Sequence, residues 1–76
     1  MNKIRRKSLR DIADKLEELK SLLEDVQSEE QEALDNIPES LQGTDRYEAT
    51  EEAVENLESA VNALDEALEY IEAAIG

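Results

Sequence analysis

Carboxylates are the side chains of this sequence that could perform chemistry. Acidic residues crowd the end of its first half and face a second acidic pair if the chain folds back: Glu29, Glu30, Glu32, Asp35 and Glu51-Glu52. Such oxygen ligands could hold a hard cation weakly, although their spacing matches no calcium-binding loop. The chain has no His and no Cys, so Glu-x-x-His di-metal sites and thiolate metal sites are both absent. Paired carboxylates also need a cleft to act as acid and base, and two thin helices offer none. We therefore expect no enzyme activity, no metal and no cofactor.

Composition points to the structural class that positions these carboxylates. The 76 residues suffice for one domain, and 38% of them are charged. Leucine, alanine, glutamate and lysine at helical spacing are typical of coiled coils and helix bundles. Phe and Trp are absent, which removes the bulky residues that line cofactor pockets or stack on bases. No apolar run is long enough for a membrane span or a signal peptide, so we expect a cytoplasmic protein.

Helix signals divide residues 1–76 into a single helical hairpin. The first helix should cover about residues 3–35, because Pro38 disfavours helical geometry at Ile37 and cannot continue the helix. Residues 36–44 should form the connection, with a short helical turn and Gly43 as its left-handed terminator. The second helix should cover about residues 45–75, with Thr44 or Asp45 as its N-terminal cap.

Heptad repeats predict how the two helices pack. Residues at alternating spacings of three and four occupy the a and d positions, which face a partner helix. In the first helix these are Leu9, Ile12, Leu16, Leu19, Leu23, Val26, Glu30, Ala33 and Ile37. In the second helix they are Tyr47, Thr50, Val54, Leu57, Val61, Leu64, Leu68, Ile71 and Ile75. The fold class is therefore an all-α, antiparallel two-helix coiled coil.

A register follows if the chain folds back about Ser40. The predicted apolar layers include Leu9 with Ile71, Leu16 with Leu64 and Leu23 with Leu57, and Glu30 with Thr50 is the polar layer. In the flanking e positions, the predicted neighbours are Arg6 with Glu72, Ala13 with Asp65, Lys20 with Glu58 and Gln27 with Glu51. No pair brings like charges together, so core and flank agree.

A second stripe of small residues on the second helix predicts an oligomer. One partner helix covers only one stripe, so a second hairpin could dock there and close a four-helix bundle, most simply as a homodimer. The alternative is that alanine was placed on the surface for its helix propensity. The predicted oligomer interface comprises Leu22, Ala49, Ala53, Asn56, Ala60, Ala63, Ala67, Tyr70 and Ala74.

Charge is distributed unevenly along the chain. Seven of the eight basic residues lie within the first 20 positions, and the net charge is −13. The basic start could bind phosphates or an anionic membrane, but we expect Asp65, Glu66, Glu69 and Glu72 to neutralise it within the hairpin, leaving no membrane binding. Such a negative chain is not expected to bind nucleic acid directly. Its acidic face could instead imitate a row of phosphates, through Glu48, Glu52, Glu55, Glu66 and Glu69.

The turn end of the hairpin is a second candidate surface for a protein partner. The loop from Pro38 to Arg46 includes Leu41 and leads into Tyr47. Glu30 is the one ionisable residue on the apolar seam of the first helix. It either bends out to water or keeps this end loose enough to rearrange around a partner.

The segment Asn36–Ala49, NIPESLQGTDRYEA, between two acidic heptad helices resembles small acidic helical-hairpin proteins of unknown function encoded in bacterial and phage genomes. The resemblance implies a phage-type inhibitor of a host system, such as a defence nuclease, that acts in the bacterial cytoplasm. From the residues we predict a non-enzymatic, oligomeric interaction module with an acidic surface. Two alternatives stay open: a nucleic-acid-mimicking decoy that blocks the basic groove of a DNA- or RNA-binding enzyme, and a structural accessory with no outside ligand.

Overall fold

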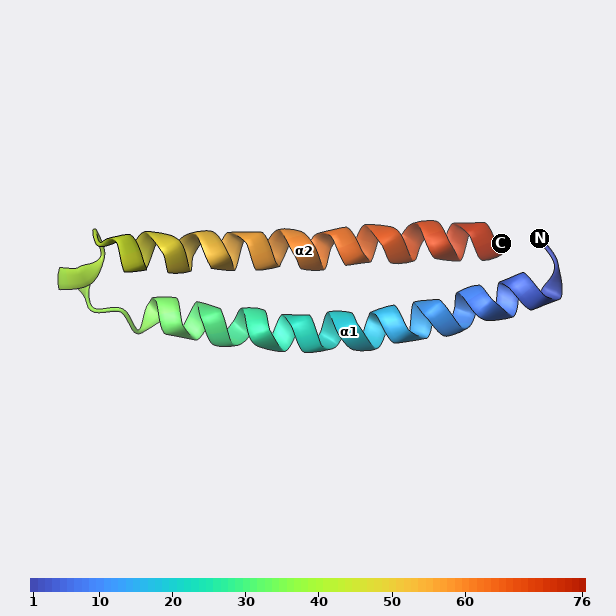
Figure 1. The fold of residues 1–76 in the computed structure, drawn as a ribbon, viewed down its shortest axis with the longest axis horizontal. Helices are drawn as coiled ribbons and strands as arrows, with labels where there is room; N and C mark the ends of the chain where they lie inside the picture. The colour runs from blue at the N-terminus through green and yellow to red at the C-terminus, as the bar shows by residue number, and fades with distance from the viewer.

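Two long helices make up almost the whole molecule. The computed structural model describes residues 1–76 as α1 (Lys3–Asp35) and α2 (Asp45–Ile75), joined by a connection that contains one 3-10 turn, η1 (Glu39–Leu41). The helices run antiparallel and side by side, as Figure 1 shows, and no strand is present. The predicted all-α helical hairpin is confirmed.

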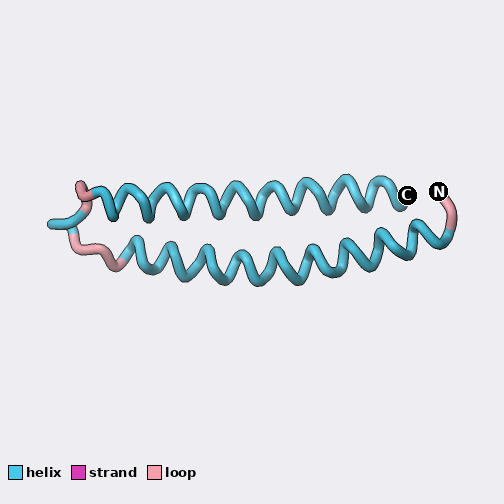
Figure 2. The backbone as a smooth tube through the Cα atoms, viewed as in Figure 1, coloured by secondary structure: helices cyan, strands magenta, loops and turns pink.

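The hairpin is a rod of 59 × 15 × 13 Å (Figure 2). Its radius of gyration is 17.4 Å, whereas a compact chain of this length would have about 11 Å. A rod of two helices leaves most side chains at the surface, because each helix has only one neighbour. Only three residues are buried, namely Val54, Val61 and Leu68, and all three lie one heptad apart on α2.

Side-chain caps begin both helices. The Asn2 side chain accepts a hydrogen bond from the Arg5 backbone N–H at 2.8 Å, which satisfies one free donor of the first turn. Thr44 does the same for α2 by accepting from the Tyr47 N–H at 3.4 Å, and its own hydroxyl donates to the Leu41 carbonyl at 2.7 Å. Thr44, rather than Asp45, is therefore the N-cap.

The connection folds without a left-handed residue. Pro38 precedes η1, and its carbonyl accepts from the Leu41 N–H at 2.8 Å. Gly76 is the only residue with a positive φ, so the prediction of Gly43 as a left-handed terminator is wrong. The 3-10 turn reverses the chain with ordinary backbone angles, and Thr44 closes it through its bond to Leu41. Nothing lies within 4 Å of a Cβ built on Gly43.

The helices do not pack in the predicted register. Lys20 pairs with Asp65 instead of Glu58, Gln27 lines a groove with Glu58 instead of Glu51, and Ala13 lines one with Glu72 instead of Asp65. Each of these α1 residues meets a residue closer to the C-terminal end of α2 than predicted, so the helices are offset along their axes. Because α1 contributes its a and e positions to the junction instead of a and d, the offset is combined with a rotation and is not a shift by a whole heptad.

This displacement leaves the ends of the helices unmatched. In Figure 1 the first turns of α1 extend beyond the end of α2, and α2 begins beyond the end of α1. Arg6 therefore has no Glu72 opposite it, and its Nε is buried without a hydrogen-bond partner. The same offset moves Glu30 away from Thr50, so the predicted layer of Glu30 with Thr50 is also wrong. The Thr50 hydroxyl donates within its own helix, to the Arg46 carbonyl.

α1 is also rotated relative to the prediction. Its half-buried side chains lie at a and e positions: Arg6, Leu9, Ala13, Leu16, Lys20, Leu23, Gln27, Glu30, Leu34 and Ile37. The d positions Ile12, Leu19, Val26 and Ala33, predicted to complete the core, are exposed. The large apolar side chains of α1 lie mainly at a and d, whereas its contact with α2 is made through a and e. Packing against α2 therefore leaves the d and g positions without cover.

Candidate interaction surface

One long edge of the hairpin is closed by an ion pair. The Lys20 ammonium donates to the Asp65 carboxylate across the two helices, and Glu24 lies 3.6 Å from the same nitrogen. The bond to Asp65 raises the pKa of Lys20 above its ordinary value of 10.5, against the opposing effect of partial burial. Both residues of the interhelical pair occupy e positions, so this edge is where the e positions of the two helices meet.

The opposite edge, where the g positions meet, is open and apolar. On α1 it exposes Ile12 by 46%, Leu19 by 57%, Leu22 by 61% and Val26 by 49%. On α2 the neighbouring surface carries the stripe of small residues. We call the two stripes together the open face: Ile12, Lys15, Leu19, Leu22, Val26, Glu29 and Ala33 from α1, with Ala49, Ala53, Asn56, Ala60, Ala63, Ala67, Tyr70 and Ala74 from α2.

The hairpin covers the small-residue stripe only on the side next to α1. Ala53, Ala60 and Ala67 are half-buried at the junction of the helices. The remaining members of the stripe are exposed: Ala49, Asn56, Ala63, Tyr70 and Ala74. Leu22, which was predicted to belong to the same interface, is exposed as well. The structure therefore brings the predicted interface residues to one side of the molecule.

Sequence reasoning missed the α1 half of this surface. Ile12, Leu19 and Val26 were predicted to be core residues, and they became surface because of the rotation of α1. A signal was present in Ala13 and Leu34, whose small and apolar side chains at e positions widen the apolar arc. With apolar residues at a and d and at some e positions, more than one neighbour is needed to cover the helix.

The candidate residues at the turn are only partly brought together. Pro38, Leu41 and Arg46 line one shallow cleft with Ile37 and with three further residues, Ala33, Asn36 and Thr44. Leu41 is 49% exposed at its rim. Tyr47 and Glu30 are half-buried and do not line this cleft.

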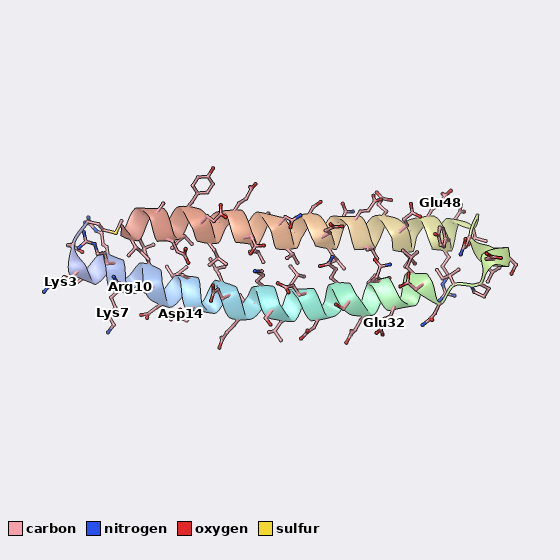
Figure 3. All side chains as sticks on the ribbon, turned by 180° about the vertical axis from the view of Figure 1, so that it is seen from behind. Lys3, Lys7, Arg10, Asp14, Glu32 and Glu48 are labelled. Carbon is pink, nitrogen blue, oxygen red and sulfur yellow. The ribbon has the colours of Figure 1, made fainter.

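The acidic candidates form a separate outer surface on α2. Glu48, Glu52, Glu55, Glu66 and Glu69 are all exposed. In Figure 3, Glu48 points away from α1. These side chains lie away from the turn cleft and do not converge on a single pocket.

The basic start of α1 is not paired with the acids of α2 as predicted. The two ion pairs of the structure are both made by Lys20, so Lys3, Arg5, Arg6, Lys7 and Arg10 have no carboxylate within 4.0 Å. Figure 3 shows Lys7 pointing away from α2. The offset between the helices explains the absence, because α1 begins beyond the last residues of α2.

The structure gathers no metal-binding cluster, since nowhere do three or more carboxylates converge to hold an ion. Neither α1 nor α2 combines the length and apolar character needed to cross a bilayer. No protein-family model matches the chain. Comparisons with curated proteins and with solved structures also found no match.

Proposed function

We propose that this chain is a non-enzymatic protein–protein interaction module that forms homodimers through its open face. In this proposal two hairpins bury their open faces against each other as a four-helix bundle with an acidic outer surface. The observation that carries the proposal is the exposure of four large aliphatic side chains, Ile12, Leu19, Leu22 and Val26, on one side of the hairpin. Clustered apolar surface of this kind marks sites of association.

The whole hairpin exposes more surface than a compact chain of its mass. The chain exposes 5870 Å², whereas a compact monomer of 8.6 kDa exposes about 4,700 Å². The excess of roughly 1,200 Å² per copy is of the size that a stable dimer interface removes from water. A second copy is also suited to the small-residue stripe, because alanines let helix backbones approach closely at little cost in side-chain entropy.

Sedimentation velocity over a range of protein concentrations tests the homodimer. We expect the parent to sediment as a dimer, and Leu22→Glu to shift it to monomer, because a carboxylate in that contact would be desolvated without a partner. Ser28→Glu is the matched control, since it adds the same charge at an exposed position on the edge that Lys20 and Asp65 close. Circular dichroism checks that both variants stay helical. A parent that stays monomeric at high concentration, or equal sedimentation of the two variants, contradicts the proposal.

A second candidate function is a decoy for a nucleic-acid-binding enzyme. It is supported by the exposure of Glu48, Glu52, Glu55, Glu66 and Glu69 on a helix whose only base is Arg46. A pull-down from host lysate, read at low and high salt, separates the two functions. Salt-sensitive capture of nucleic-acid-binding proteins favours the decoy, because charge contacts are screened. Salt-resistant association of the chain with itself favours the interaction module.

A further inference from the structure

Acidic side chains border the open face along both of its long sides. On α1 the row next to Leu19 and Leu22 consists of Asp11, Glu18, Asp25 and Glu32, and all four are exposed. On α2 the row next to the exposed alanines contains Asp45, Glu52 and Glu66, which are also exposed. We call these two rows the acidic rims. No basic residue interrupts either row.

The acidic rims lie beside the apolar side chains of the open face, which we call its floor. Their charges therefore interact with any helix that covers this floor. Glu18 and Leu22 line the same surface depression, and Asp11 and Glu18 line the next one together with Lys15. Within the floor itself the charges of Lys15 and Glu29 offset each other. The charge that a bound helix meets is therefore set by the rims and is negative on both flanks.

A second copy of the chain matches the apolar floor of the open face but carries the same charge as the acidic rims. When two open faces meet, the acidic rims of one copy approach those of the other, and like charges across a helix interface oppose association. Burial of the apolar floor can outweigh this repulsion, which is why a homodimer is the proposed state of the chain alone. A partner helix whose flanks are basic would avoid this repulsion.

We infer that the open face selects an amphipathic helix with basic flanks, and that such a helix displaces the second copy. This inference rests on the proposed function, because it uses the same face. The exposed side chains from Ile12 to Val26 extend about 21 Å along α1, which corresponds to the length of a partner helix of about four turns. The alanine side of the floor accepts large apolar residues, and Lys or Arg on each flank of the partner meets Glu18 and Asp25 on one side and Glu52 and Glu66 on the other. Anionic partners such as nucleic acid or an acidic membrane are repelled by the same rims.

A pair of designed peptides tests the charge selection. The probe is a helical peptide of about 18 residues with a leucine seam flanked by lysines on both sides, and the control has the same seam flanked by glutamates. We expect the lysine-flanked peptide to form a complex with one hairpin and one peptide, with loss of the homodimer in sedimentation velocity. Its affinity should exceed that of the control by about tenfold or more, since several exposed ion pairs act together. The difference should shrink between about 0.05 M and about 0.5 M salt.

Charge reversal on one rim gives the sharper test. Glu18→Lys with Asp25→Lys should lower affinity for the lysine-flanked peptide and raise it for the glutamate-flanked one. The matched control is Glu58→Lys with Glu72→Lys, which makes the same change in net charge at exposed positions beside the closed edge and should leave the preference unchanged. Circular dichroism confirms that both variants remain helical hairpins.

Each outcome separates this inference from the proposed function. A persistent homodimer that binds neither peptide overturns the basic partner and leaves the homodimer standing. Equal binding of the two peptides overturns the selection by charge. A chain that stays monomeric and still binds the lysine-flanked peptide overturns the homodimer and supports the inference. A monomer that binds neither peptide overturns both.

Discussion

The two long edges of the hairpin are built from the same pair of helices and have opposite chemistry. At the closed edge Lys20 reaches Asp65 across the interface, and Glu24 adds a second carboxylate nearby. At the open edge Leu19 and Leu22 remain more than half exposed. One helix can turn only one part of its apolar arc toward a single neighbour, so close packing at one edge leaves the other edge without cover.

The difference also separates the side chains that stabilise the hairpin from those that we propose for association. Val54, Val61 and Leu68 stabilise the hairpin itself, because they are its three buried side chains. The side chains of the open face contribute little to the isolated hairpin, and they stabilise the fold only when another helix packs on them. Substitutions at the two places should therefore depend differently on protein concentration.

The largest expected effect is a contrast between two leucines. Leu68→Ala should lower the free energy of unfolding by about 2–3 kcal/mol at every concentration, because Leu68 is only 6% exposed. Leu19→Ala should cost about 1 kcal/mol in dilute solution, because more than half of its side chain is already in water, and more at high concentration. Urea denaturation at two protein concentrations measures both. Equal costs in dilute solution would remove the distinction between the buried core and the open face.

A smaller effect is expected at Glu30, the one ionisable residue among the a and d positions of α1. Glu30→Leu should raise the free energy of unfolding by about 1 kcal/mol, because residue 30 is half-buried where the two helices meet and an apolar side chain there gains contact with α2. Glu32→Leu serves as the control, since that exposed position should change stability by less than about 0.5 kcal/mol. If Glu30→Leu binds a partner as well as the parent does, a loose turn end is not part of the mechanism. An unchanged stability would argue against the observed register.

The connection offers a test that touches neither edge. Gly43→Ala should raise the free energy of unfolding by about 0.4–1 kcal/mol, because Gly43 has no positive φ and an added Cβ meets nothing. The stabilisation comes from the unfolded chain, which loses conformational freedom. Thermal unfolding followed by circular dichroism measures it, and sedimentation should be unchanged. Destabilisation would instead indicate the left-handed Gly43 expected from the sequence.

The smallest effect concerns the ion pair of the closed edge at alkaline pH. The pKa of Lys20 is raised in the folded hairpin, so the protonated lysine stabilises the fold below pH 10.5, and this contribution is lost as the pH rises through the raised value. Asp65→Asn removes the partner, so its deficit in stability should be constant near neutral pH and should shrink above pH 10.5. Glu66→Gln is the control for net charge. A deficit that does not change with alkaline pH would show that the pair contributes nothing to the closed edge.

Local residue chemistry was sufficient to predict the elements of the fold. Pro38 predicts the end of the first helix, since it bars helical geometry at Ile37, and a heptad spacing of apolar residues predicts helices on both sides of the connection. Thr44 could be recognised as a possible cap by its side chain alone. Each of these features depends on neighbours within a few positions along the chain, which is why they can be read without knowing what lies across the interface.

Half of the open face could also be predicted. The alanine stripe indicated a second neighbour for α2, because its spacing repeats that of the large residues. The α1 half of the open face could not be predicted, because Ile12, Leu19 and Val26 occupy d positions that fit an ordinary coiled-coil core equally well. Their exposure depends on the rotation of α1 about its own axis.

The sequence by itself determined that the chain forms two amphipathic helices with basic residues at the start, acids elsewhere and more apolar surface than one hairpin can bury. The tertiary structure alone decided the register and the rotation, and with them the pairing of Lys20 and Asp65, the isolation of Arg6 and the position of the open face. The physical reason is that more than one set of positions on a heptad helix can make the contact. The a positions of α1 can pack together with either the d or the e positions, so the choice passes to the length and geometry of the connection and to a few ion pairs across the interface.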